Sequence, residues 1–215
     1  MLTAKYERSL AFLICFVLFT WACTNPVAEH LTQGDAYRAA EQWDEAIAEY
    51  GEAIKLDPNA VSAYIRRAGV YRSKGEYGKA MADCSKAIQL DPDSPWGYIC
   101  RGDVYHSEGK YDKAMADFNK AIDLDLANAR AYTCRGNVHH SKGDHDKAIA
   151  DHSKAIELDP GMAAAYYSRG NAYKAQGKKA EAIAEYEKFI AISQDPSEIQ
   201  AAQQMIDQLQ TQDAP

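Results

Sequence analysis

The chain repeats itself at one fixed interval along most of its length. Tyrosine, arginine and glycine each return at this interval in four successive units, and alanine returns in five. The recurring residues are Tyr64, Tyr98, Tyr132 and Tyr166, then Arg67, Arg101, Arg135 and Arg169, then Gly75, Gly109, Gly143 and Gly177, and finally Ala46, Ala80, Ala114, Ala148 and Ala182. They define five units, 27–60, 61–94, 95–128, 129–162 and 163–196. A unit of this size buries its apolar face only by stacking on its neighbours, which predicts an elongated array.

Each unit is predicted to form two helices joined by a tight turn. In the third unit, Ala114, Phe118 and Ala121 are spaced by four and three residues, which places them on one face of a helix. Gly109 supplies the left-handed backbone that ends the helix before it. An Asp-Pro pair is expected to end the second helix of three units. These pairs stand at 57–58, 91–92 and 159–160.

Small residues and aromatic residues recur in register along the units. Glycine or alanine lets the first helix approach the second closely, and aromatic side chains fill the gaps between helix pairs. The small residues of the first helix stand at 34, 68, 102, 136 and 170. Of the 14 tyrosines, all except Tyr6 lie in the five units. The tyrosine surplus therefore indicates packing between helices rather than a nucleotide or sugar site.

The unit resembles the tetratricopeptide repeat (TPR), whose pattern over roughly 34 residues is W-x2-L-G-x2-Y…A-x3-F…P. The third unit carries Tyr98, Arg101, Gly102, Tyr105, Ala114 and Phe118 at the matching positions. The resemblance implies an all-α fold, a right-handed superhelical solenoid of five helix-turn-helix repeats. Departures are Glu41 in place of the turn glycine, Leu126 in place of the proline and Phe189 in place of a small alanine.

The residues after the fifth unit are predicted to form a capping helix over 197–210 and a disordered tail over 211–215. An apolar stripe on this helix would shield the last repeat from water. The stripe consists of Ile199, Ala202, Ile206 and Leu209. Ser197 and Gln200 resemble a capping box that starts the helix. A partner-binding amphipathic helix is the alternative interpretation.

The N-terminal residues are predicted to be a targeting segment rather than part of the array. Lys5 and Arg8 precede an apolar run over 10–22, which is shorter than the roughly 20 residues that span a bilayer as a helix. A basic start followed by a short apolar run is typical of a secretory signal peptide.

The residues around Cys23 resemble the lipobox of bacterial lipoproteins, in which the cysteine becomes the lipidated first residue. Thr20 and Trp21 depart from that pattern. We expect 1–22 to be a signal peptide or membrane anchor and 23–26 a short tether. The protein is then exported and membrane-anchored, facing the periplasm of a bacterial envelope, rather than cytoplasmic. Cleavage without a lipid and an uncleaved anchor stay open as alternatives.

The sequence contains no pattern typical of catalysis. It has no Gly-rich phosphate loop, no Ser-His-Asp arrangement and no Cys-x-x-Cys pair. A net charge of −7 and a pI near 5.4 argue against nucleic acid as a partner. We expect a protein that is not an enzyme and that has no catalytic residues and no cofactor.

Three cysteines lie in the repeats, Cys84, Cys100 and Cys134. An odd number argues against a disulfide framework. Cys100 and Cys134 occupy equivalent positions in adjacent first helices, and helix axes pack about 8–10 Å apart, which is beyond comfortable disulfide reach. We therefore expect buried or half-buried thiols.

Histidines gather in the fourth unit. His139, His145 and His152 stand where most other units carry aromatic residues, which predicts packing positions filled by a smaller, polar ring. Protonating these rings should loosen the unit below about pH 6. The alternative is a metal site, and with it a metal-binding sensor or an enzyme. We favour the packing interpretation and expect no metal ligands.

The TPR resemblance implies a partner-binding concave face lined by the first helices. In the family, the second, fifth, ninth and twelfth positions of each repeat point there. The expected peptide-binding residues are Ile65, Arg72, Trp96, Ile99, Asp103, His106, Arg130, Asn137, His140, Tyr167 and Lys174. Basic or protonatable residues at the twelfth positions, beside apolar side chains, suit an extended acidic-apolar peptide. Pairs within one helix, Asp35–Arg38 and Asp103–His106, offer a purely structural role for part of this row.

Together these features predict a non-catalytic scaffold that docks a peptide segment of an envelope partner. The TPR domains that bind Hsp70 or Hsp90 tails use lysine at the fifth position of a repeat, and the fifth positions here hold none. We therefore expect no Hsp70/Hsp90 tail clamp. A structural oligomerisation array joined through the C-terminal helix is a further alternative.

Overall fold

The computed structural model describes residues 25–211, and this part of the chain contains helices and turns but no strand. Five helix pairs follow one another, and a single helix closes the array. The pairs are α2 (Pro26–Ala39) with α3 (Trp43–Leu56), α4 (Val61–Ser73) with α5 (Tyr77–Leu90), α6 (Pro95–Ser107) with α7 (Tyr111–Leu124), α8 (Ala129–Ser141) with α9 (His145–Leu158), and α10 (Ala163–Ala175) with α11 (Lys179–Ile192), before α12 (Pro196–Thr211). The predicted all-α solenoid with a final capping helix is confirmed.

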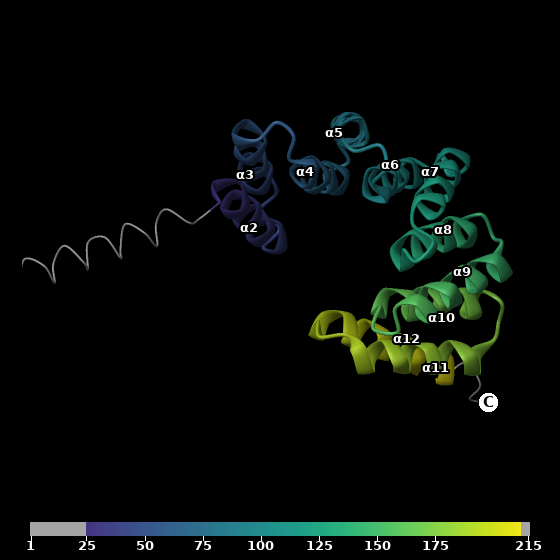
Figure 1. Cartoon of the computed structure of the whole chain (residues 1–215). Coiled ribbons are helices and arrows are strands. Elements are labelled where there is room, and N and C mark those ends of the chain that lie inside the picture. The colour runs from purple at the N-terminus through teal and green to yellow at the C-terminus, as the bar shows by residue number, and fades with distance from the viewer. Residues whose placement is uncertain (1–24, 212–215) are drawn as a thin grey trace, which may run out of the picture.

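The helix pairs stack side by side into an arc (Figure 1). The helices α4, α6, α8 and α10 lie on its inner side, and α5, α7 and α9 lie on its outer side. The first helix of each pair also contacts the first helix of the next pair, from α2 through to α10. The concave wall is therefore built from first helices, as the resemblance implies.

A small residue on the first helix makes room for a ring on the second. A Cβ atom added to Gly102 would lie 2.6 Å from Cε1 of Phe118, closer than a side chain can approach without a shift. The second pair is the exception, because Ala68 and Cys84 occupy these two positions and are both fully buried. The other close pairs are Gly34 with Tyr50, Gly136 with His152 and Gly170 with Tyr186.

An ion pair joins the two helices of repeats two to five, and its acidic partner is buried in repeats two to four and half-buried in repeat five. Arg101 Nε and Nη2 each donate to a carboxylate oxygen of Asp117 over 2.8 Å. The hydrogen bonds to Asp117 raise the pKa of Arg101 above its ordinary value. The equivalent pairs are Arg67–Asp83, Arg135–Asp151 and Arg169–Glu185. The arginines that recur once in each of these repeats are therefore structural.

The turn inside each helix pair needs a left-handed residue, as predicted. Glycine takes this conformation in four repeats, with φ between 72° and 82°, and Glu41 takes it in the first with φ 57°. The turn between pairs depends on aspartate rather than on proline. Asp125 Oδ1 accepts a hydrogen bond from the N–H of Ala127, and α7 ends in register although Leu126 replaces the proline.

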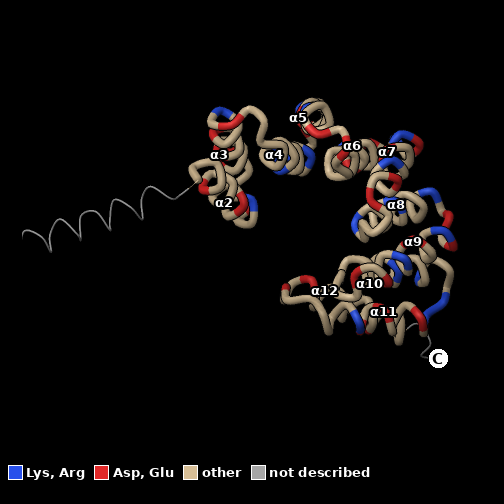
Figure 2. The backbone as a smooth tube through the Cα atoms, viewed as in Figure 1, with Lys and Arg blue, Asp and Glu red and all other residues tan. Residues whose placement is uncertain are grey.

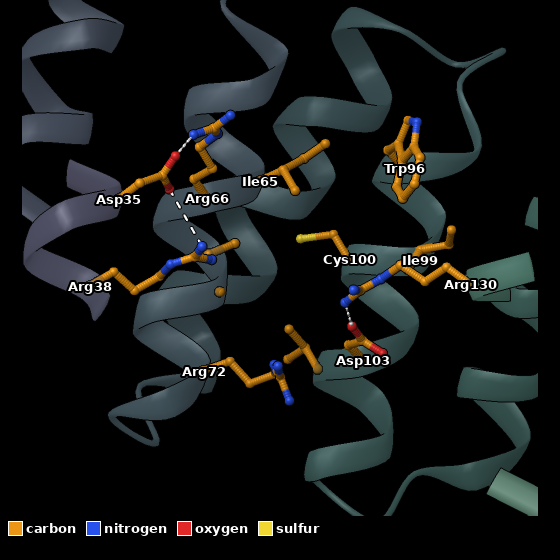
Figure 3. Close-up of a pocket in the computed structure, with 13 residues that line it drawn as sticks. Asp35, Arg38, Ile65, Arg66, Arg72, Trp96, Ile99, Cys100, Asp103 and Arg130 are labelled. Atoms are coloured by element: carbon orange, nitrogen blue, oxygen red, sulfur yellow. Dashed lines mark hydrogen bonds and ion pairs between the residues drawn. The ribbon is translucent and has the colours of Figure 1, made fainter. Parts of the chain in front are cut away.

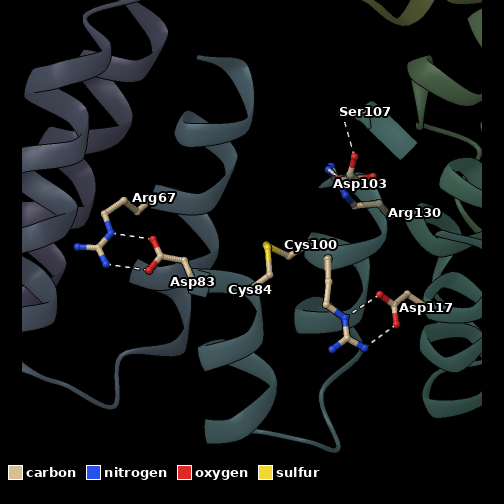
Figure 4. The surroundings of a disulfide bond; sticks show 9 residues. Arg67, Asp83, Cys84, Cys100, Asp103, Ser107, Asp117 and Arg130 are labelled. Carbon is tan, nitrogen blue, oxygen red and sulfur yellow. Dashed lines mark hydrogen bonds and ion pairs between the residues drawn. A yellow bond between two sulfur atoms is a disulfide. The ribbon is translucent and has the colours of Figure 1, made fainter. Parts of the chain in front are cut away.

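The prediction of free thiols is wrong for two of the three cysteines. Cys84 and Cys100 form a disulfide, with their Cα atoms 5.6 Å apart (Figure 4), whereas Cys134 is a buried free thiol. The prediction compared adjacent first helices and overlooked the contact between the second helix of one pair and the first helix of the next. Because α5 packs on α6, Cys84 reaches Cys100, and the bond ties repeat two to repeat three.

The last helix, α12, packs its apolar stripe on α11. Ala202, Ile206 and Leu209 are buried there. The predicted capping box at Ser197 is wrong, because Asp195 is the residue that caps α12. Its Oδ1 accepts hydrogen bonds from the N–H and the hydroxyl of Ser197, over 2.8 and 2.7 Å. Proline is favoured at the first helical position, so α12 begins at Pro196, and Asp195 just before it is the cap.

Some predictions concern residues outside the described range. They are the signal peptide or anchor over 1–22, the lipidation of Cys23, the beginning of the tether and the end of the C-terminal tail. Within residues 25–211, no helix combines the length and the apolar character that crossing a membrane requires.

Candidate functional site

A groove of about 480 Å³ lies on the concave wall and is lined mainly by α4 and α6 (Figure 3). Residues from α2 and one residue from α8 complete the lining. Six of the eleven predicted peptide-binding residues meet here. They are Ile65, Arg72, Trp96, Ile99, Asp103 and Arg130. The structure therefore gathers the N-terminal half of the predicted surface into one place.

Arginines outnumber acidic residues in this groove by four to two. Asp35 accepts a hydrogen bond from Arg66 and lies 3.5 Å from Nη2 of Arg38, and Asp103 lies 3.4 Å from Nη2 of Arg130. Charged residues of both signs are spread over the whole array (Figure 2). The excess of two positive charges is therefore a local property of an otherwise acidic chain.

Arg72 is the arginine of the groove that no carboxylate of the described residues pairs with. Its Nη1 lies 3.4 Å from the hydroxyl oxygen of Ser107. That hydroxyl donates its own proton to the carbonyl oxygen of Asp103, over 3.0 Å, so its oxygen is left to accept from Arg72. The half-buried guanidinium of Arg72 keeps donors that a bound anion could use.

Repeat two lacks two side chains that meet each other in other repeats. In repeats one and five, a tyrosine of the second helix donates its hydroxyl to the ninth-position residue. These contacts are Tyr50 to Asp35 and Tyr186 to Asn171. In repeat two the ring is replaced by Cys84 and the ninth position is Gly69, at which an added Cβ would meet nothing within 4 Å. Gly69 and Cys100 both line the groove.

Apolar side chains border one end of the groove. Trp96 is 48% exposed, although it is among the largest side chains of the chain, and Ile65 beside it is half-buried. Ile99 is only 2% exposed, so it supports the wall rather than offering a contact surface. In Figure 3, Ile65 and Trp96 lie toward one end of the hollow and Arg72 lies toward the other.

Two of the remaining predicted residues are histidines whose burial lowers their pKa. His106 Nε2 lies 2.9 Å from the hydroxyl of Ser141, and the ring of His140 lies 5.0 Å from that of His145. Burial lowers the pKa of both His106 and His140. The predicted row of cations along the twelfth positions is therefore interrupted at neutral pH in repeats three and four.

Asn137, Tyr167 and Lys174 also lie outside the groove. The carbonyl of Asn137 accepts a hydrogen bond from Ser141, and Lys174 Nζ lies 3.2 Å from Sδ of Met205 on α12. Tyr167 lines a separate cleft of about 330 Å³ between α10, α11 and α12. The structure does not bring these residues together with Arg72.

The list of peptide-binding residues predicted from the sequence left out Arg66 and Gly69, although Gly69 stands at one of the ninth positions expected to face the groove. Arg66 stands at a sixth position, which reaches the groove only because Asp35 of the preceding first helix holds it there. Gly69 has no side chain and so gave no positive signal. The signal that could have found it is the absence of a side chain at the ninth position of one unit, where the other four units carry aspartate or asparagine.

The histidines of repeat four are packed as the aromatic register predicts. His152 is fully buried, and neither of its ring nitrogens has a hydrogen-bond partner in the described part of the chain. Burial, followed by the positive charges of His140, Arg169 and His139, lowers the pKa of His152 to about 3. Among residues 25–211, no three His, Cys, Asp or Glu side chains gather in an arrangement able to hold a metal ion.

The burial of His152 makes stability depend on pH. The unfolded side chain keeps its ordinary pKa near 6.5, so between pH 6.5 and about 3 the unfolded state binds a proton that the folded state excludes. The stability that depends on the neutral ring of His152 is therefore complete above pH 6.5 and is lost as the pH falls toward 3. At pH 5 we expect a loss of about 2 kcal/mol in the free energy of unfolding relative to pH 7.5.

The variant His152→Phe isolates this effect, because Phe118 fills the same slot in repeat three. Urea denaturation of both proteins at pH 7.5 and pH 5 should show the variant losing about 2 kcal/mol less than the wild type. Parallel losses in the two proteins would contradict the prediction. His139 and His140 are present in both proteins, so their own titration cancels in the comparison.

Comparisons with known proteins agree on one family. Residues 102–143 and 136–177 match a family described as TPR repeat, and residues 31–95, 84–116 and 163–196 match families described as tetratricopeptide repeat. A solved structure of MamA protein is 31% identical, and the match covers 77% of this chain and 91% of that one, with a TM-score of 0.54. The chain belongs to the tetratricopeptide-repeat family. A comparison with the curated proteins returned no match.

Two further TPR structures resemble this one. TTC0263, a thermophilic TPR protein in Thermus thermophilus, is 20% identical over 84% of this chain and 98% of its own, with a TM-score of 0.76. YrrB, a TPR protein with an unusual peptide-binding site, is 23% identical over 81% of this chain and 90% of its own, with a TM-score of 0.53. At these identities the likeness concerns the TPR fold alone.

Proposed function

We propose that this TPR protein is a non-catalytic scaffold that docks an extended, acidic-apolar segment of a partner protein in the groove between α4 and α6. The observation that carries the proposal is the half-buried Arg72, which has no carboxylate partner among the described residues, in a groove with an excess of positive charge. Such a site attracts carboxylates, and the attraction favours acidic partners over others. YrrB, a neighbour of the same fold, has a peptide-binding site.

The apolar component of the partner follows from Trp96. Tryptophan and arginine are among the residue types most enriched at the positions that dominate binding energy at interfaces. Trp96 is half-exposed at the border of the groove and lies on the same wall as the arginines. A segment with both an apolar and an acidic side chain therefore matches both parts of the surface.

We also propose that the protein is exported and tethered to the membrane of a bacterial envelope through its N-terminus, with Cys23 as the lipidated residue. The disulfide between Cys84 and Cys100 supports an oxidising compartment, because such bonds persist outside the cytosol and are rare inside it. Cell fractionation and mass spectrometry of the mature N-terminus test this. Cytosolic protein with an unmodified Cys23 would contradict it.

The docking proposal is tested by capturing partners from envelope extracts on immobilised protein. We expect the double variant Arg72→Gln/Trp96→Ala to lose the partner that the wild type retains. The matched control is Lys120→Gln, which removes the same charge from an exposed position on α7, away from the groove. Equal capture by the wild type and the double variant would remove the groove from the function.

A further inference from the structure

We propose that the end of the groove bordered by Ile65 and Trp96 receives one large apolar side chain of the bound segment, that the segment crosses the open space over Gly69, and that an acidic residue about three positions away pairs with Arg72. This inference rests on the proposed function and specifies the partner. It makes Gly69 the position that keeps the path between the two ends of the groove open. Three observations carry the inference, namely the freedom of Gly69, the polarity of the groove and its length.

The first observation is that the fold does not require glycine at position 69. Gly69 lies inside α4, its backbone is not left-handed, and an added Cβ would meet nothing within 4 Å. By contrast, Gly102 touches the Phe118 ring and could not be enlarged without a shift. A glycine inside a helix lowers stability relative to alanine. Its effect at position 69 is to keep open a space that a side chain would fill.

The second observation is that the groove has an apolar end and a basic end. Ile65 and Trp96 border one end of the open space, beside the ion pair of Arg66 with Asp35, and the guanidinium of Arg72 lies at the other end (Figure 3). Arg66 and Arg130 are already paired with Asp35 and Asp103. Arg72 is therefore the groove arginine best placed to receive a carboxylate from the partner, because binding there displaces no ion pair.

The third observation is the distance between the two ends. Ile65 and Arg72 are seven residues apart on α4, which at 1.5 Å per residue is about 10 Å along the helix axis. An extended peptide advances about 3.3 Å per residue. An apolar side chain at Ile65 and a carboxylate at Arg72 are therefore about three residues apart in the bound segment.

Fluorescence anisotropy with synthetic peptides tests this spacing. The probes are short, fluorescein-labelled serine-based peptides that carry one phenylalanine and one glutamate, separated by different numbers of residues. We expect the tightest binding when the two are about three positions apart. Replacing glutamate with glutamine in that peptide should weaken binding about tenfold, because a charge-assisted hydrogen bond to Arg72 is lost. Equal affinity for all spacings would overturn the proposed geometry.

Variants of the protein test the roles of Gly69 and Arg72. Gly69→Leu should weaken binding of the best peptide at least about tenfold, while thermal melting shows a fold at least as stable, since leucine favours a helix more than glycine does. The control Gly78→Leu makes the same substitution at another open position outside the groove and should leave binding unchanged. Arg72→Gln should remove the preference for glutamate over glutamine, and Lys120→Gln should keep it.

Failure here can be told apart from failure of the proposed function. If Gly69→Leu leaves peptide binding unchanged, but Arg72→Gln/Trp96→Ala abolishes partner capture, the groove binds a partner and the pocket assignment is wrong. If the double variant also captures the partner normally, the groove is not the docking surface.

Discussion

Replacing Arg101 with methionine should lower the free energy of unfolding by about 3 kcal/mol. The side chain of Asp117 is 8% exposed, and both of its oxygens accept hydrogen bonds from Arg101. The substitution keeps the bulk of the side chain but leaves a buried carboxylate without its cation. The loss of the partner, rather than the loss of packing, is therefore what the variant measures by urea denaturation.

The double variant Arg101→Met/Asp117→Leu is the internal control. Removing both charges leaves no orphaned carboxylate, so most of the lost stability should return. A second control is Lys55→Met, which breaks the exposed pair between Lys55 and Glu52 on α3 and should cost less than about 1 kcal/mol. The explanation fails if Arg101→Met unfolds at the same urea concentration as the wild type, or if the double variant is no more stable than the single one.

Removing the disulfide should lower the free energy of unfolding by about as much as Arg101→Met does. The bond joins Cys84 and Cys100, whose sequence separation is 16, and the restriction that this places on the unfolded chain corresponds to about 3 kcal/mol. We expect the variant Cys84→Ala/Cys100→Ala to lose about this much stability, and the reduced wild-type protein to lose a comparable amount. Urea denaturation with and without dithiothreitol provides the measurement.

The free thiol supplies the control for this experiment. Cys134→Ala retains the disulfide, so dithiothreitol should lower its stability as it lowers that of the wild type. The variant Cys84→Ala/Cys100→Ala has no bond to reduce, so dithiothreitol should not change its stability. Mass spectrometry shows whether dithiothreitol has freed both thiols of the wild type. If both are free and the urea midpoint is the same as without dithiothreitol, the bond contributes no stability.

The fold was predictable because its signals are local and repeated. The glycine of the turn and the small residue on the first helix recur from unit to unit, so each copy supports the interpretation of the others. The ion pairs were within reach as well, since Asp83, Asp117 and Asp151 recur in the same register as the arginines they pair with.

The errors in prediction arose where two repeats meet. The disulfide joins the second helix of repeat two to the first helix of repeat three, and neither cysteine recurs in a way that indicates this contact. The capping residue of α12 was misplaced by two positions, because Ser197 fits a local pattern that Asp195 satisfies with better-placed hydrogen bonds. Such contacts depend on how helices sit against each other rather than on spacing within one helix.

The helix pairs and the number of repeats follow from the amino-acid sequence alone, and the resemblance to the TPR implied that the first helices line the concave face. Apolar periodicity and turn residues act over a few positions, so each unit specifies its own two helices and the turn between them. The location of the groove, by contrast, is a property of the tertiary structure. It is open at repeat two, where Gly69 has no side chain, and the neighbouring first helices add Arg38 and Arg130 to the lining that Arg66 and Arg72 of α4 supply. A missing side chain has a consequence only when its neighbours in space are known.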